Sequence, residues 1–264
     1  MKMNILGDWI DRLQASGRYT FLRVEAMNST GMSAEATKKA IQRLIKRNRI
    51  AKIKDYFFVI VPTEYRAAGL PPAAWFANQL MVAMGLPYYV GLLSAAAIHG
   101  ASHHQPQEFQ IVTSKPVRLL VLARQRLHFI VRTHLNSTPF VPVRTPTGNI
   151  RVSTPEATAI DLVRFNKWAG GFGNAGTIIG ELVDKMTSGA LISTAEQMGE
   201  LTAAQRLGYL LDLLGARALG DSLADWIALK RPRFMPLSPG VSMRHAPRDE
   251  RWRLFVNDTL EVEM

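Results

Sequence analysis

Cationic side chains recur at helical spacing between Ser33 and Arg47, a pattern suited to an anionic partner. At about 100° per residue, one side of this helix is apolar and is formed by Ala36, Ala40, Ile41, Leu44 and Ile45. The other side offers cations and amides that can hold DNA phosphates or reach base edges. The candidate DNA-binding residues are Ser33, Thr37, Lys38, Lys39, Gln42, Arg43, Lys46 and Arg47, together with Lys52 and Lys54 just beyond.

Position along the helix suggests a division of roles. The candidates for base or phosphate contact are Lys38, Lys39, Gln42 and Arg43. The candidates for holding the DNA backbone are Lys46, Arg47, Lys52 and Lys54. The alternative is a solvated helix face with no ligand. DNA binding is favoured because residues 1–70 carry 13 Lys and Arg against six Asp and Glu, out of a net charge of +11 for all 264 residues.

Three other groups of residues resemble a cofactor site, a metal site or a nuclease site, but each lacks part of the pattern that such a site requires. The stretch GFGNAG (Gly171–Gly176) matches the dinucleotide fingerprint G-x-G-x-x-G, but a helical pattern precedes it rather than a strand, so a loop between helices is expected. His99, His103 and His104 lack a nearby carboxylate before Glu108, and a helix end or loop is favoured over a metal site. The pair Glu156 and Asp161 has no companion residues that would complete a nuclease site. The sequence therefore predicts no catalytic residue, no metal and no cofactor.

The elements around the basic helix form a recognisable series. Helical spacing predicts one helix over Ile5–Ala15 and a second over about Phe21–Met27, followed by a turn and by Ser33 as the N-cap of the basic helix. Alternation then predicts two strands, over 50–54 and 57–61, with a turn near Lys54 and Asp55. Helix, helix, turn, basic helix and hairpin is the order of a winged helix-turn-helix.

The stretch AAGLPPAA (Ala67–Ala74) predicts a boundary between residues 1–70 and 71–264. The uncharged stretch Leu80–Ile98 approaches the length of a membrane span, but Gly85 and Pro87 interrupt it, so two buried helices are expected and no membrane partner.

Five short strands and a helical region from Thr154-Pro155 to about Lys230 follow. The fold class expected is α+β, with a winged helix-turn-helix followed by an antiparallel sheet and a helical lobe. The strands are expected at Phe109–Val112, Val117–Val121, Leu127–Arg132, Val141–Thr145 and Ile150–Ser153, with a further one in the C-terminal tail.

Cysteine is absent, which excludes a disulfide framework and thiol catalysis. The N-terminal segment has acidic residues after a very short apolar run, unlike a signal peptide. A cytoplasmic location is expected.

Four segments carry a resemblance to a known family. They are YYVGLLSAAAIHGASHHQPQEFQIVT (Tyr88–Thr113), VSTPEATAIDLVRF (Val152–Phe165), RLGYLLDLLG (Arg206–Gly215) and WRLFVND (Trp252–Asp258). With these segments and the expected winged helix, the chain resembles the AbiEi antitoxins, the DNA-binding half of the AbiE abortive-infection toxin–antitoxin systems of bacteria.

The resemblance implies a type IV antitoxin that binds operator DNA, represses its own operon and counteracts a nucleotidyltransferase-like toxin without a stable complex. One hypothesis for the action of residues 71–264 is a nucleic-acid-binding basic surface formed by Arg118, Arg124, Arg126 and Arg132. The alternative is that these arginines are solvated strand positions. Two further alternatives are a transcription factor whose second part senses a small molecule, and a metal-dependent nucleic-acid-processing enzyme using His99, His103 or the Glu156/Asp161 pair.

Overall fold

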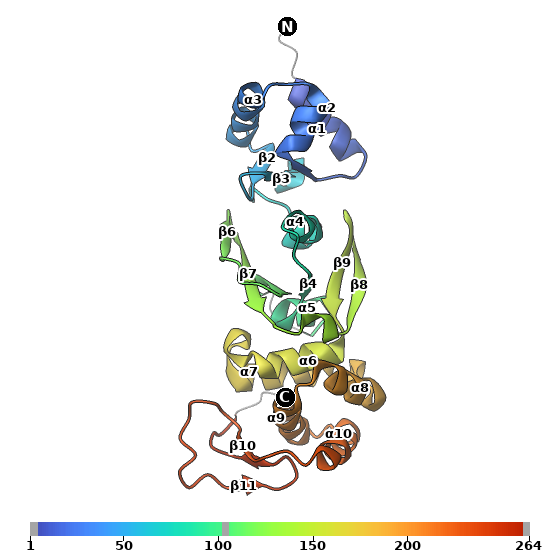
Figure 1. Cartoon of the computed structure of the whole chain (residues 1–264), viewed down its shortest axis with the longest axis vertical. Helices are drawn as coiled ribbons and strands as arrows, with labels where there is room; N and C mark the ends of the chain where they lie inside the picture. The colour runs from blue at the N-terminus through green and yellow to red at the C-terminus, as the bar shows by residue number, and fades with distance from the viewer. Residues whose placement is uncertain (1–4, 102–105, 261–264) are drawn as a thin grey trace. The chain divides into compact units, whose positions relative to one another are not determined.

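The computed structural model describes residues 5–101 and 106–260 and shows a mixed α+β protein with several sheets (Figure 1). The expected α+β class is confirmed. The chain forms two compact units, of which the first contains residues 1–88, 107–131 and 142–151 and the second contains 89–106, 132–141 and 152–264. The division at residue 70 stays a prediction.

The first unit begins with three helices and a small antiparallel sheet of order β1-β3-β2. The helix expected over Ile5–Ala15 is present with those bounds. The second helix starts later than expected, because Thr20–Leu22 pairs with a later strand instead of joining the helix. The elements are α1 (Ile5–Ala15), β1 (Thr20–Leu22), α2 (Arg23–Thr30), α3 (Ala34–Lys46), β2 (Ile50–Lys52) and β3 (Phe57–Ile60).

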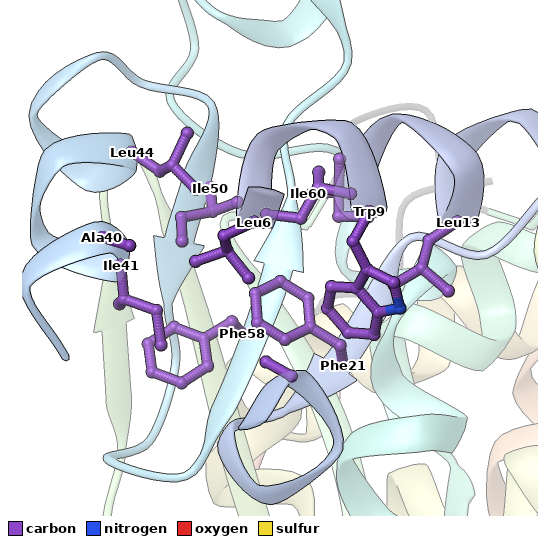
Figure 2. Close-up of a cluster of buried hydrophobic side chains, with 12 residues drawn as sticks. Leu6, Trp9, Leu13, Phe21, Ala40, Ile41, Leu44, Ile50, Phe58 and Ile60 are labelled. Carbon is purple, nitrogen blue, oxygen red and sulfur yellow. The ribbon is translucent and has the colours of Figure 1, made fainter. Parts of the chain in front are cut away.

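One apolar cluster holds these six elements together (Figure 2). The Trp9 ring meets Phe21 edge-on with centroids 5.4 Å apart, and Phe21 stacks on Phe58 at the same separation. From α3, Ile41 and Leu44 enter the same cluster. Burying these side chains fixes which face of α3 is left outside, since each large apolar side chain removed from water contributes about 1.5–3 kcal/mol.

Local backbone chemistry sets the ends of α3. Gly31, with a φ of 65°, ends α2, and its N–H bonds to the Met27 carbonyl. The Ser33 hydroxyl accepts from the Ala36 N–H at 3.3 Å, so the expected N-cap is confirmed. Asn48, with a φ of 50°, reverses the chain after α3 toward the hairpin. A three-residue connection therefore joins α2 to α3.

The remainder of the first unit starts with short 3-10 turns and α4 (Ala77–Ala83). In the stretch expected to be a boundary, Leu70, Pro71 and Ala73 are buried. The Gln125 side-chain amide donates to the carbonyls of Leu70 and Pro71 at 3.3 and 2.9 Å. This stretch is therefore packed against its own unit.

A six-stranded sheet of order β6-β7-β5-β4-β9-β8 contains all five strands that were expected, and one that was not. The antiparallel prediction is wrong, because β5 pairs with β7 in parallel over six residues and β4 pairs with β9 in parallel. After β5 the chain passes to the edge as β6, turns at Ala123 with a φ of 50°, and returns as β7 between β6 and β5. The strands are β4 (Tyr88–Val90), β5 (Glu108–Thr113), β6 (Leu120–Leu122), β7 (Gln125–Val131), β8 (Phe140–Thr145) and β9 (Gly148–Ser153).

The stretch from Leu80 to Ile98 forms two helices as expected, α4 and α5 (Leu92–Ile98), with β4 between them. Both helices carry buried faces. Among the helices of residues 5–101 and 106–260, none combines the length and the apolarity that crossing a membrane requires.

The second unit is built around α6 (Pro155–Arg164), which packs against α5, α7, α8 and α9. The Thr154 hydroxyl accepts from the Ala157 N–H and Pro155 occupies the first helical position, as expected. The GFGNAG stretch is not a loop: it forms the first turns of α7, and a 3-10 turn precedes it rather than a strand. The other helices are α7 (Gly171–Leu182), α8 (Ser188–Met198), α9 (Leu201–Leu213) and α10 (Arg217–Lys230).

A three-stranded sheet follows α10, formed by β10 (Met235–Pro236), β11 (Arg248–Asp249) and β12 (Leu254–Phe255) in the order β10-β12-β11. The strand expected in the tail is thus limited to two residues among those described. Between β11 and β12 the fully buried Trp252 lies directly on α9 at Gly208, and its Nε1 donates to the Asp212 carboxylate at 2.6 Å. Two of the four segments that carry the family resemblance meet here.

The close approach at Gly208 gives a stability prediction. A Cβ at this position would lie 1.9 Å from the Trp252 ring, so Gly208→Ala must displace the indole. We expect the free energy of unfolding to fall by about 3 kcal/mol in urea denaturation. The control is Gly189→Ala in α8, where a Cβ meets nothing within 4 Å. That change should be neutral or stabilise by up to about 1 kcal/mol, and equal losses for the two variants would contradict the assignment.

Candidate nucleic-acid interface

The outward face of α3 carries most of the predicted DNA-binding residues. Those that are exposed are Ser33, Lys38, Lys39, Gln42, Arg43, Lys46 and Arg47. Their opposite face contributes Ala40, Ile41 and Leu44 to the core. The structure thus brings seven of the ten predicted residues together on one solvent-facing side of one helix.

Four cations of this face have no ion pair with a described carboxylate: Lys38, Arg43, Lys46 and Arg47. Lys39 lies 3.2 Å from Glu35 one turn earlier, and both side chains are exposed. Exposed pairs of this type contribute only a few tenths of a kcal/mol, so Lys39 can exchange Glu35 for a phosphate at little cost. The face therefore offers free positive charge.

Thr37 is a correction to the predicted set. Its side chain is fully buried, and its hydroxyl has no hydrogen-bond partner in the part of the chain that is described. A position facing the core cannot contact a ligand on the opposite side of the helix. Thr37 belongs to the support of α3 and is removed from the candidate interface.

The β2–β3 hairpin holds the two remaining predicted residues. Lys52 is exposed and pairs with the Asp55 carboxylate at 2.9 Å, which lowers the pKa of that carboxyl. Lys54 is half-buried near the turn. The Arg23 guanidinium, at the start of α2, donates to the Asp55 carbonyl and so ties the hairpin turn to the helices.

The basic surface predicted from Arg118, Arg124, Arg126 and Arg132 is not supported as one surface. Arg118 and Arg124 are exposed, and Arg126 is paired with Glu108 at 2.8 Å. Arg132 belongs to the other unit, and its side chain is 2% exposed. It is a core residue that pairs with the buried Asp161 and the partly buried Glu200.

Arg132 is the centre of a buried ion-pair network. One guanidinium nitrogen donates to Asp161 of α6 at 2.8 Å, and the other donates to Glu200 at 3.1 Å. The Tyr89 hydroxyl of β4 donates to the second Asp161 oxygen at 2.7 Å, and Arg164 pairs with the second Glu200 oxygen at 2.8 Å. A network in which both carboxylates are held by donors compensates much of the cost of burying charge.

Burial raises the pKa of Asp161 to about 6, although Arg132 lies beside it. The folded carboxyl thus holds its proton more tightly than the unfolded one, whose pKa is near 3.8. Folding stability from this group therefore decreases as the pH rises from about 4 to about 6. Burial also raises the pKa of the Tyr89 hydroxyl well above 10, so it remains a donor.

The residues suggested for a metal-dependent enzyme have structural partners. The buried Glu156 accepts from the Thr187 N–H at 3.3 Å, and a His99 ring nitrogen lies 2.7 Å from the Ser153 carbonyl. Asp161 is occupied by Tyr89 and Arg132. In residues 5–101 and 106–260 no group of three or more His, Asp or Glu side chains could hold a metal ion; His103 and His104 lie outside the described residues.

This chain is similar in fold to a solved structure, and part of it matches a family model. A crystal structure of the RV2827C protein from Mycobacterium tuberculosis is similar, with a TM-score of 0.68 and 14% sequence identity, over 96% of this chain and 91% of that one. At this identity the likeness concerns the fold. No curated protein sequence matches the chain.

The central part of the chain resembles an antitoxin domain. Residues 89–213 match the family model described as the AbiEi antitoxin C-terminal domain. This match supports an AbiEi-type antitoxin and, with it, the antitoxin role of a toxin–antitoxin system. All five members of the Arg132 network, the buried Tyr89, Arg132 and Asp161, the partly buried Glu200 and the exposed Arg164, fall within the matched residues.

Sequence analysis missed two sets of residues. The partners of Arg132 gave no local pattern, because Tyr89 and Glu200 lie far from it along the chain. The stretch 231–255 carries six arginines and no lysine, interleaved with Phe234, Trp252 and Phe255. That pattern of arginine and aromatic residues was visible in the sequence.

The network gives a second prediction. Arg132→Met leaves the fully buried Asp161 without its cation, while Glu200 keeps Arg164. We therefore expect the free energy of unfolding to fall by about 3–5 kcal/mol in urea denaturation. Arg126→Met is the matched control, since it breaks a pair in which Arg126 is half-exposed and should cost less than about 1 kcal/mol. Similar values for both variants would show that Arg132 does not stabilise the core.

Proposed function

We propose that the chain represses its own operon by binding operator DNA through a winged helix-turn-helix, in which α3 is the recognition helix and β2–β3 is the wing. The element order α1-β1-α2-α3-β2-β3 supports this assignment. So does the short connection between α2 and α3, which begins with a left-handed glycine. Residues 1–70 would be the DNA-binding part.

The observation that carries the proposal is the division of α3 into two faces. One face is buried among Trp9, Phe21 and Phe58, and the other presents four unpaired cations and the Gln42 amide. A recognition helix needs this arrangement, because its orientation must be fixed while its polar side chains remain free to meet bases and phosphates. A solvated surface helix also has one polar face, but the exposed face here carries five cations and a single carboxylate, Glu35, and this bias toward positive charge favours an anionic partner.

We further propose that residues 71–264 counteract a nucleotidyltransferase-like toxin, without a stable complex between the two proteins. The support is the AbiEi antitoxin domain over residues 89–213. Repression and toxin neutralisation would then depend on different parts of the chain.

The recognition-helix assignment predicts two kinds of loss. Lys39→Ala/Arg43→Ala should lower the affinity for operator DNA and reduce its preference over random duplex, because base contacts give about 1–3 kcal/mol of discrimination each. Lys52→Ala/Lys54→Ala should weaken binding to all sequences and reduce the slope of log K against log salt by up to about 2. Fluorescence anisotropy at several salt concentrations measures both effects. Equal losses for operator and random DNA in both variants would refute the assignment.

The separation of roles predicts a partial phenotype for the full-length chain. With Lys39→Ala/Arg43→Ala, a reporter behind the operon's promoter should be derepressed, while cells that express the toxin should still grow. The matched control is Arg118→Ala/Arg124→Ala, also a loss of two exposed cations, which should preserve repression. Loss of rescue in the α3 variant, at unchanged protein level, would show that neutralisation requires DNA binding.

A further inference from the structure

The sheet β10-β12-β11 and its loops carry a second cationic surface, separate from α3 and outside the matched residues 89–213. We call it the arginine surface and define it as Arg231, Arg233, Arg244, Arg248 and Arg253. All but Arg253 are exposed. It lies wholly within the second unit.

Most of this charge is not neutralised within the described chain. Arg253 pairs with Glu250 at 3.1 Å, and the other four arginines have no ion pair with a described carboxylate. The neighbouring Arg251, by contrast, is held by Asp212 and Asp221 and is therefore left out of the surface. Several unpaired guanidinium groups within one short stretch favour an anionic partner.

Aromatic rings lie directly beneath two of these guanidinium groups. Arg248 and Phe255 are opposite each other in the β11–β12 register, and the guanidinium carbon of Arg248 lies 5.5 Å from the Phe255 ring centroid. It lies 5.3 Å from the Phe234 centroid, while that of Arg253 lies 4.8 Å from the same ring. The two rings are 5.4 Å apart and half-buried. Planar guanidinium groups held over rings form flat faces of the kind that bases stack on.

A hollow of about 530 Å³ adjoins this sheet. Its lining includes Arg244, His245, Asn257, Asp258 and Thr259. The Asp258 carboxylate accepts from the Ser238 hydroxyl through one oxygen at 2.6 Å. Its other oxygen is an acceptor beside the cations, which suits a partner that bears hydroxyl donors as well as phosphates. The Asn257 side chain is engaged within the loop, because it accepts from the Ser238 N–H and donates to the Ser238 and Val241 carbonyls.

We propose that the arginine surface binds single-stranded RNA, with bases stacking on the guanidinium faces at Phe234 and Phe255 and a nucleotide entering the hollow. A duplex offers phosphates but no unstacked base. The ribose 2′-hydroxyl, which deoxyribose lacks, is a donor for the Asp258 acceptor of the hollow. The sheet also has strands of only two residues and loops between them, and so it lacks a helix or ribbon that could enter a groove.

The test uses the full-length chain and a fluorescein-labelled RNA of about 12 nucleotides without self-complementarity, within the range of about 4–16 nucleotides that such surfaces bind. Arg233→Glu/Arg244→Glu changes two exposed arginines that have no ring contact in the described structure. We expect at least a roughly tenfold loss of affinity and a salt slope smaller by about 1.4, for two lost phosphate contacts. Arg118→Glu/Arg124→Glu has the same change in net charge and should bind as the wild type does.

A second variant tests stacking separately from charge. Arg248→Lys keeps the cation and removes the guanidinium plane, so affinity for the RNA should fall about fivefold or more while the salt slope stays the same. The thermal unfolding midpoint of each variant establishes that it is folded. The Lys39→Ala/Arg43→Ala variant should retain RNA binding, which separates this proposal from that of operator recognition.

Four results would overturn the proposal. They are unchanged RNA affinity in Arg233→Glu/Arg244→Glu, an equal loss in Arg118→Glu/Arg124→Glu, wild-type affinity in Arg248→Lys, and equally tight binding of the DNA strand of the same sequence or of random duplex DNA.

Discussion

The Arg132–Asp161 ion pair is a fully buried interaction at the centre of the second unit. It joins the residue directly after β7 to the middle of α6, while Tyr89 adds β4 and Glu200 adds the start of α9. Four segments that are far apart in the sequence are thereby fixed at one buried point. Because each charge can be buried only when its partners are in place, the network favours a single arrangement of these segments over other compact packings.

The first unit relies on a different constraint, the one-sided burial of α3. Stacked Phe21 and Phe58, with Trp9 at their edge, fill the space beneath the helix, and the buried Thr37 shows how far that core extends around it. The rotation of α3 about its axis is therefore set by packing and not by its charges. Packing determines which cations face outward, and the electrostatics of the interface follow from it.

Sequence patterns were sufficient where the determining contacts are local. Spacing and residue type predicted the bounds of α1, the caps at Ser33 and Thr154, and five of the six strands of the large sheet. The pairing of the strands could not be predicted from the sequence, because β7 lies between β5 and β6. The strand β4 (Tyr88–Val90) was missed because it is part of a longer apolar stretch. The exposure of Arg132 was also misjudged, because its partners Asp161 and Glu200 are distant along the chain. Thr37 was misplaced because it lies at the edge of the helical face, where one position decides burial.

The contact between Gly208 and Trp252 has a consequence for synthesis of the chain. The apolar site on α9 that receives the indole is made roughly 44 residues before the indole itself. At about 5–20 residues per second, a ribosome takes between roughly two and nine seconds to supply it. During that interval the place of the indole on α9 stays empty, so the helical lobe cannot complete its packing until nearly the whole chain has been synthesised.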